Sequence, residues 1–480
     1  MGKIQRLAGE TVLYGLGSIL PRFLNFLLVR LHTNVFGPEE YGIITNLYAW
    51  VGVVNIVFIF GMETAYFRFA SKTGNSEQRV FNLAQTVVIV ISTILSVAFV
   101  LLAEPIGNTL EVSGRTDLVM WLVAIMFVDA IAAIPFARLR LQKKALRFAV
   151  GKLLNIGILV GLNVYFLKYA QGYEPNVSLV VLANLAANAF YLVFFAPMLL
   201  SWRPAYDKEI SPAMYSYAYP IMVTGLAGMT NEMFSRIMLV KWLPEGFYGI
   251  HSEQYALGVF GACYKLSVLM NLTITAFRYA AEPFFFSNAS DKNSPQLFAR
   301  VNHYFLIVCC VILLAVSINL DILKYFLGNP AYWEGLHIVP ILLLAYLFLG
   351  MYYNFSVWFK LTDRTYYGTL ITVIGMIITI VANYFLIPIA GYEGSAVAAL
   401  LCYFAMTVIC YFLGQRYYPI PYNVGKILLY ITVTLLFVYG TSAIEISNQV
   451  AATAFHMVVI FVFLILIYFA EGRQLRLKRA

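Results

Sequence analysis

The chain alternates between long apolar stretches and short polar connections. Fourteen apolar segments can be marked along it, each close to the roughly 20 residues that a helix needs to cross a bilayer. Their approximate extents are 11–32, 41–62, 83–103, 118–137, 149–169, 179–200, 213–240, 255–277, 298–318, 335–356, 367–388, 394–413, 426–442 and 449–469. The last four are separated by short, weakly polar connections, so twelve spans are a second interpretation. The pattern predicts an all-α, polytopic membrane protein.

The composition agrees with this pattern. Of the 480 residues, 61% are hydrophobic and 11% are charged, whereas soluble domains have about 45–50% apolar and about 25% charged residues. So few charges cannot cover a water-soluble surface. An ordinary soluble enzyme, a disordered chain and a nucleic-acid-binding domain are therefore excluded, and the net charge of +9 is better explained by membrane orientation.

The basic residues predict that orientation, because Lys and Arg collect in cytoplasmic loops. With the N-terminus placed in the cytoplasm, 24 of the 32 basic residues fall in the inner loops and tails, and only four fall in outer loops. The remaining four lie inside the apolar segments. This asymmetry predicts that both termini are cytoplasmic. The basic connector 138–152 is interpreted as a topology anchor, with contact to anionic lipid headgroups as the alternative.

Basic residues inside apolar segments are costly unless they face water or a partner. Arg22 lies near the middle of the first segment and Lys265 near the middle of the eighth. Arg30 and Arg236 lie in the outer halves of the first and seventh segments. Three such residues facing lipid would cost roughly 9 kcal/mol, so we expect them to point into a hydrated cavity that favours an anion. For Arg30, extension to the outer interface is an equal alternative.

The acidic residues in or near the segments are fewer. Glu232 and Arg236 are four residues apart, and so are Arg278 and Glu282, so each pair shares a helix face. Simple pairing that fixes helix packing is the favoured interpretation for both. Asp129 stands alone in the middle of the fourth segment, and Glu63 lies where the second segment meets the cytoplasm.

Several chemistries lack their sequence motifs. The chain contains no G-x-x-x-x-G-K-[ST], no H-E-x-x-H and no G-x-S-x-G. Its five cysteines include no C-x-x-C, and its five histidines are scattered. We therefore expect no cofactor, no metal and no catalytic site. The first apolar segment carries Arg22 and is too long for a cleaved signal peptide.

The opening of the chain resembles a known family. Residues 9–50, GETVLYGLGSILPRFLNFLLVRLHTNVFGPEEYGIITNLYAW, are similar to the start of the Wzx-type oligosaccharide-lipid flippases, the polysaccharide transport family. The runs GMETAYFRFASK (61–72) and AFRYAAEPFFF (276–286) also resemble that family. The likeness extends over the full length and implies the multidrug/oligosaccharidyl-lipid/polysaccharide exporter superfamily.

The resemblance implies an architecture and a set of binding residues. The expected parts are an N-lobe of six spans over 1–205, a pseudo-symmetric C-lobe of six spans over 206–413, and two extra spans with a basic cytoplasmic tail over 414–480. Spans 1, 2, 7 and 8 would line a central cavity whose basic residues engage a diphosphate. By their position on those spans, the expected substrate-binding residues are Arg22, Arg30, Arg236, Lys265 and Arg278.

The implied function is a flippase that carries an undecaprenyl-diphosphate-linked oligosaccharide to the outer leaflet of a bacterial inner membrane. It would serve O-antigen or other lipopolysaccharide and surface polysaccharide biosynthesis. The expected partners are membrane lipids and the glycosyltransferases and polymerase of the same pathway, and not nucleic acid. A peptidoglycan lipid II flippase, a cation-coupled drug antiporter and a membrane glycan polymerase are the alternatives.

The energy source is a separate question. Without an ATP-binding motif, transport must use an ion gradient, the membrane potential or removal of the product. Asp129 is the first candidate for a protonatable coupling group, followed by the carboxylates Glu63, Glu232 and Glu282.

Overall fold

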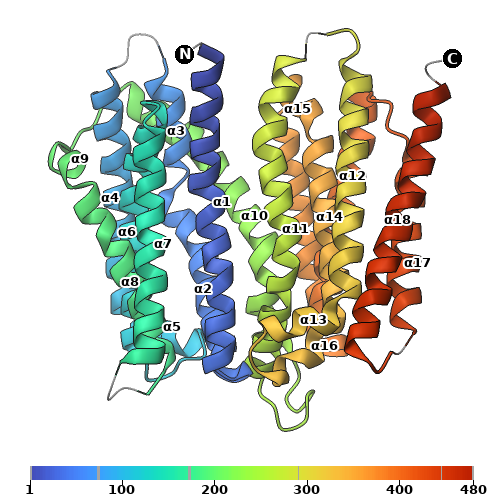
Figure 1. The fold of residues 1–480 in the computed structure, drawn as a ribbon. Coiled ribbons are helices and arrows are strands. Elements are labelled where there is room, and N and C mark those ends of the chain that lie inside the picture. The colour runs from blue at the N-terminus through green and yellow to red at the C-terminus, as the bar shows by residue number, and fades with distance from the viewer. Residues whose placement is uncertain (1–2, 73–75, 171–173, 290, 445, 478–480) are drawn as a thin grey trace. The chain divides into compact units, whose positions relative to one another are not determined.

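The protein is built from α-helices (Figure 1). The computed structural model describes residues 3–72, 76–170, 174–289, 291–444 and 446–477, without the side chains of 3–16, 18 and 472–477. Those ranges contain no β-strand. The predicted all-α class is confirmed.

Most helices are long, and the short ones lie beside their ends. The long helices are α1 (Lys3–Val35), α2 (Pro38–Ile59), α4 (Glu77–Leu101), α6 (Thr116–Leu141), α7 (Ala145–Val164), α8 (Val177–Phe194), α10 (Ile210–Trp242), α11 (Glu253–Ser287), α12 (Ser294–Ile318), α14 (Val339–Phe355), α16 (Tyr366–Tyr417), α17 (Val424–Ser442) and α18 (Gln449–Leu477). The short ones are α3 (Met62–Ala70), α5 (Ala103–Thr109), α9 (Ala196–Leu200), α13 (Leu320–Leu323), α15 (Val357–Leu361), a π-helical turn (Tyr165–Tyr169) and two 3₁₀ segments (Lys324–Phe326 and Pro330–Ile338).

Helices extend over every predicted apolar segment. Eleven helical stretches among the described residues are long and apolar enough to cross a membrane, and the chain is a multi-pass membrane protein. One of these stretches, α16, covers two predicted segments, and α1 and α10 cover two more. The count of fourteen crossings stays a prediction.

The helix α16 changes direction at Gly391. Its backbone angles there are φ 54° and ψ −131°, which lie outside the helical region. A Cβ atom at this position would also lie against the ring and hydroxyl of Tyr248. Glycine alone fits such a conformation without strain, so this residue separates the two apolar segments that the sequence distinguishes.

The chain forms two compact units. One comprises Met1–Ala262 with Thr372–Ala398, and the other comprises Cys263–Ile371 with Ala399–Ala480. Helices α11 and α16 each contribute residues to both units. The predicted lobe boundaries at 205 and 413 stay a prediction.

The first unit is assembled around α6, which packs against α2, α3, α4, α7 and α8. Helix α1 packs along α7, and a Cβ at Gly17 would lie 2.9 Å from the Cα atom of Ala149. The beginning of α11 approaches α2 even more closely. A Cβ at Gly258 would lie 1.8 Å from the carbonyl oxygen of Pro38, so the two backbones touch where glycine leaves room.

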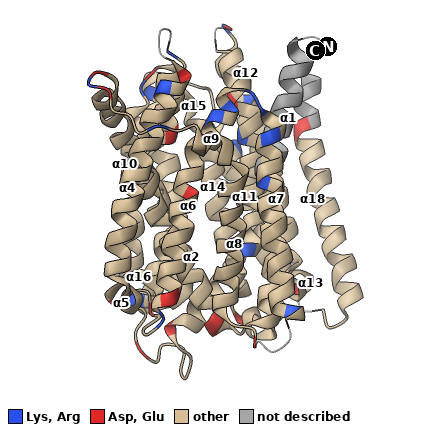
Figure 2. Ribbon diagram, turned by 90° about the vertical axis from the view of Figure 1, so that its left-hand side faces the viewer, with Lys and Arg blue, Asp and Glu red and all other residues tan. Residues whose placement is uncertain are grey.

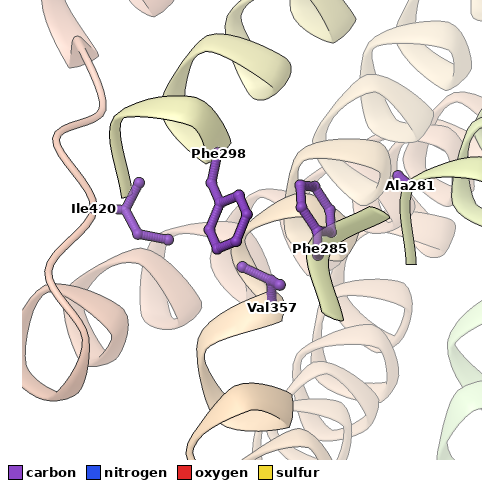
Figure 3. Packing of buried hydrophobic residues seen from close by; sticks show 5 residues of the cluster. All are labelled: Ala281, Phe285, Phe298, Val357 and Ile420. Atoms are coloured by element: carbon purple, nitrogen blue, oxygen red, sulfur yellow. The ribbon is translucent and has the colours of Figure 1, made fainter. Parts of the chain in front are cut away.

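The second unit is assembled around α12, which packs against α14, α17 and α18. A hydrophobic cluster joins several elements of this unit (Figure 3). It joins Ala281 and Phe285 of α11, Phe298 of α12, Val357 of α15 and Ile420 of the connection to α17. The rings of Phe285 and Phe298 meet edge to face, with centroids 5.0 Å apart, a preferred aromatic geometry.

Charged residues gather near the ends of the helices, and the middles of the helices are almost free of them (Figure 2). The long helices α1 and α10 run without a break through Pro21 and Pro220. The few charges placed inside apolar helices therefore stand out, as the sequence predicts, and the candidate site is built from them.

Candidate functional site

The two arginines of α1 are exposed. Arg22 and Arg30 are eight residues apart, so they lie about 80° apart around the helix and about 12 Å apart along it. On other sides of the same helix Leu28 and Val29 are buried. Both guanidinium groups are therefore carried by surface positions of α1 within the first unit.

Arg236 lies in a different environment from the α1 arginines. It is only 8% exposed on α10, and its guanidinium contacts the sulfur of Met233. Glu232, one turn earlier, is half-buried. Burying an Arg side chain in an apolar helix is costly unless the guanidinium has a polar or charged partner. The packing of α10 holds Arg236 in this buried position.

The same helix carries a ladder of buried polar side chains that faces the first half of α16. Asn231 donates to the carbonyl oxygen of Thr372 at 3.2 Å, and Thr379 donates to the Asn231 side chain. One turn further on, Asn383 donates to Ser235 Oγ at 3.1 Å. These hydrogen bonds tie α10 to α16 within the first unit.

Asp129 lies in a polar network between α6, α7 and α8. The Asn188 amide donates to Asp129 Oδ1 at 3.0 Å, and the Asn155 amide donates in turn to Asn188 Oδ1 at 3.1 Å. The Lys152 ammonium lies within electrostatic range of the Asp129 carboxylate and 4.0 Å from the ring centre of Phe136. Asp129 is therefore not alone, contrary to the impression given by the sequence.

The basic connector 138–152 is tied into the first unit. Arg138 donates to Glu77 at 2.9 Å, and Arg140 forms an ion pair with Glu63. The Arg140 guanidinium also lies over the ring of Phe67, 4.9 Å from its centre. Glu63 therefore has a cationic partner at the start of α3.

In the second unit, Lys265 and Arg278 both lie on α11 and are half-buried. They are 13 residues apart, which is about 20 Å along a helix, and do not meet. Beside Lys265, Tyr264 is buried against Tyr346 of α14, with ring centroids 5.8 Å apart.

Arg278 borders a small pocket that is partly open to the outside. The Arg278 guanidinium lies 3.9 Å from the ring centre of Tyr353. Glu282 Oε1 lies 2.6 Å from Lys360 Nζ and 4.0 Å from Arg278 Nη2. The predicted contact between Arg278 and Glu282 is present, but the closer partner of Glu282 is Lys360, a residue that the sequence analysis did not select.

Apolar side chains and one amide also line the pocket. Phe277, Phe285 and Phe286 of α11 line it. Asn354 of α14 also lines it and is 2% exposed. The Asn354 amide donates to the carbonyl oxygen of Gly350, while its own Oδ1 has no hydrogen-bond partner in the described part of the chain.

The described residues contain no group of three or more His, Cys, Asp or Glu side chains that could hold a metal ion. The predicted cations are divided between the two units. Arg22, Arg30 and Arg236 belong to the first, and Lys265 and Arg278 to the second.

The family is shown by a sequence comparison. The profile of the family described as "Polysaccharide biosynthesis protein" matches residues 7–289, which is more than half of the chain. The chain belongs to the polysaccharide biosynthesis protein family. No curated protein matches it.

Solved structures show which fold this family member has. A lipid II flippase, MurJ, in an inward closed conformation is 11% identical, with a TM-score of 0.75 over 96% of this chain and 99% of that one. An inward-facing multidrug resistance MATE transporter of the MOP superfamily is 13% identical, with a TM-score of 0.66 over 88% and 99% of the two chains. A MOP superfamily transporter from Pyrococcus furiosus is 14% identical, with a TM-score of 0.59 over 85% and 95%. The predicted superfamily fold is confirmed.

Proposed function

We propose that the protein is a Wzx-type flippase. It turns an undecaprenyl-diphosphate-linked oligosaccharide from the cytoplasmic to the outer leaflet by alternating access, without changing a covalent bond of the substrate. The observation that carries the proposal is the presence of Arg22, Arg236 and Lys265 within the apolar segments of α1, α10 and α11. Membership of the polysaccharide biosynthesis protein family supports a glycan as the transported group.

The proposed role of the cations is to hold the diphosphate. Arginine offers a planar fork of N–H donors that fits phosphate oxygens, and lysine offers a point charge. We assign this role to Arg22, Arg30, Arg236, Lys265 and Arg278. The exposed positions of Arg22 and Arg30 suit first contact with a charged group, while the burial of Arg236 suits a later, drier stage of transport.

Asp129 is our proposed coupling group. Its carboxylate lies within an apolar helix, with one amide donor and a nearby ammonium group. Glu63 and Glu282, by contrast, each form a direct ion pair with a basic side chain. Among the four carboxylates considered, Asp129 is therefore our first choice for the group that exchanges a proton during transport.

The proposed setting is the inner membrane of a bacterium, with both termini in the cytoplasm and glycosyltransferases and a polymerase as pathway partners. A peptidoglycan lipid II flippase is the second candidate. The fold match to a protein described as a lipid II flippase favours it. A drug antiporter is less favoured, because the cations inside the apolar segments favour an anionic passenger. A glycan polymerase is less favoured, because the predicted outer loops are short.

The two candidates are separated by transport in proteoliposomes. The purified full chain is reconstituted with either a fluorescent undecaprenyl-diphosphate-linked oligosaccharide or fluorescent lipid II. Accessibility to a membrane-impermeant quencher then reports translocation. We expect protein-dependent translocation of the oligosaccharide lipid and little of lipid II. Translocation of lipid II alone would favour the second candidate, and translocation of neither would contradict both.

A further inference from the structure

The six basic residues of the connector 138–152 fall into two groups. Three of them already have a carboxylate nearby within the first unit. The other three, which we call the basic triad, are Lys143, Lys144 and Arg147, and none of them pairs with a carboxylate in the described part of the chain. The two lysines are exposed, and the first turn of α7 contains no acidic residue. The positive charge of the triad is therefore not balanced by the described residues around it.

The turn that ends α6 places one triad residue where glycine is usual. The Lys144 N–H donates to the carbonyl oxygen of Leu139 at 2.8 Å, and the Lys143 N–H donates to that of Arg140 at 3.0 Å. These two bonds form a Schellman motif, in which Lys143 occupies the position that most often holds glycine. Its φ of 56° lies in the left-handed region, where a side chain is strained. The chain therefore carries a cation at a position for which the backbone alone favours glycine.

The triad adjoins an exposed apolar face of α7. Leu146, Val150 and Leu154, which we call the apolar stripe, are 65%, 38% and 48% exposed. They are spaced four residues apart, so they share one side of the helix. Other sides of α7 pack against α1, α6 and α8, and the Arg147 guanidinium lies 5.6 Å from the ring centre of Phe194 of α8. In a multi-pass membrane protein, an exposed apolar face of this kind suits contact with acyl chains.

We propose that the turn between α6 and α7 binds an anionic phospholipid of the predicted cytoplasmic leaflet. The lipid phosphate lies among the cations of the basic triad, and an acyl chain lies along the apolar stripe. Charge complementarity carries the choice of ligand, since clustered basic residues at a membrane surface attract anionic headgroups. A phospholipid matches both the triad and the stripe, whereas a free phosphate matches only the triad. The site concerns the surrounding membrane and does not depend on what the protein transports.

The proposal says more than the positive-inside rule does. That rule counts the basic residues of a loop and assigns them no ligand. The test therefore replaces all three residues of the basic triad by glutamine. The matched control is Lys208→Gln/Lys292→Gln/Arg300→Gln, which also removes two lysines and one arginine. Its three positions are exposed, and the predicted topology places them in the cytoplasm as well.

Binding is measured on the full chain in detergent by native mass spectrometry, with phosphatidylglycerol or phosphatidylethanolamine as the added lipid. At low salt we expect the wild type to prefer phosphatidylglycerol. The triad variant should bind that lipid at least about tenfold more weakly, and the control variant should match the wild type. Unchanged affinity in the triad variant, or an equal loss in the control, would overturn the proposal. Release of the lipid by sodium phosphate, but not by sodium chloride at equal ionic strength, would show a site for free phosphate and would also overturn it.

Lys143→Gly separates the charge from the backbone. Glycine removes the strain of the left-handed φ, so thermal unfolding in lipid-free detergent should occur at the same or a higher temperature. The affinity for phosphatidylglycerol should still fall about fivefold, because one of three cations is lost. Lys143→Arg keeps the charge and should keep the affinity. Wild-type affinity in Lys143→Gly, or an equal loss in Lys143→Arg, would contradict the proposed site.

Discussion

Asp207 organises the start of α10 through its carboxylate. Oδ1 accepts hydrogen bonds from the backbone N–H groups of Ile210 and Glu209, each at 2.9 Å, and Oδ2 pairs with Arg79 of α4. These interactions favour the charged form, so the backbone N–H groups first, and then Arg79, hold the pKa of Asp207 below its ordinary value. Asp207 therefore holds the segment 201–209 against α4 and the start of α10, and the strength of these contacts depends on pH.

The first prediction concerns Asp207→Asn. Because the pKa is lower in the folded state, the charged carboxylate stabilises the protein at pH values above the unfolded pKa of about 4. This contribution is lost as the pH falls through the lower, folded pKa. Thermal unfolding in detergent should therefore show a less stable variant at pH 7 and a smaller difference at pH 3. Glu209→Gln, at an exposed neighbouring position, is the control, and an equal difference at both pH values would contradict the account.

At this scale the sequence predicted which residue types matter better than it predicted their partners. Arg22, Arg236 and Lys265 stand out because each interrupts an apolar segment. Lys152 and Lys360 do not stand out, since they lie in short basic connections that the positive-inside rule already explains. Only the folded chain shows that Lys152 lies near Asp129 and that Lys360 contacts Glu282.

At the scale of elements, the carboxylate of Glu471 helps to fasten α18 to its unit. Glu471 Oε1 accepts from Tyr430 of α17 at 2.8 Å and from Lys426 at 3.2 Å, and His303 Nε2 of α12 lies 3.0 Å away. Most of the rest of α18 is exposed, which suits a helix that faces lipid. One residue therefore joins three helices at the end of the chain.

We expect Glu471→Gln to loosen α18 and to lower the free energy of unfolding by about 1–3 kcal/mol, since it weakens hydrogen bonds to a charged group. Hydrogen exchange over 449–471 and thermal unfolding measure the change. Glu104→Gln, at an exposed carboxylate on α5, should leave both unchanged. Faster exchange spread evenly over the protein, and not concentrated in α17 and α18, would argue against this role for Glu471.

Element positions could be predicted from hydropathy alone, because each apolar segment must satisfy its own backbone as a helix in lipid. The positions of the short helices could not be predicted from hydropathy. The turn at Phe60 and Gly61, where φ is positive at both residues, divides α2 from α3 inside one apolar run. The bend at Gly391 lies in a helix that continues on both sides. Such local backbone changes leave little trace in a hydropathy pattern.

At the scale of the whole molecule, both compact units carry part of the predicted cation set. The all-α multi-pass fold was predictable, because composition and hydropathy leave few other solutions in a bilayer. The two units were not predictable in detail, since α11 and α16 each contribute to both. The division depends on long-range packing, such as the approach of Gly258 to Pro38, which hydropathy does not encode.

The central claim is that cations within the apolar helices hold a diphosphate during transport. The most direct measurement is translocation of the undecaprenyl-diphosphate-linked oligosaccharide by Arg22→Ala/Lys265→Ala in proteoliposomes. Arg115→Ala/Lys168→Ala, in predicted outer loops, is the control with the same change in charge. Loss of two charge-assisted contacts, each about 1.5–3 kcal/mol, predicts a fall in rate of at least about a hundredfold for the first pair and none for the control. Wild-type transport by Arg22→Ala/Lys265→Ala would contradict the account.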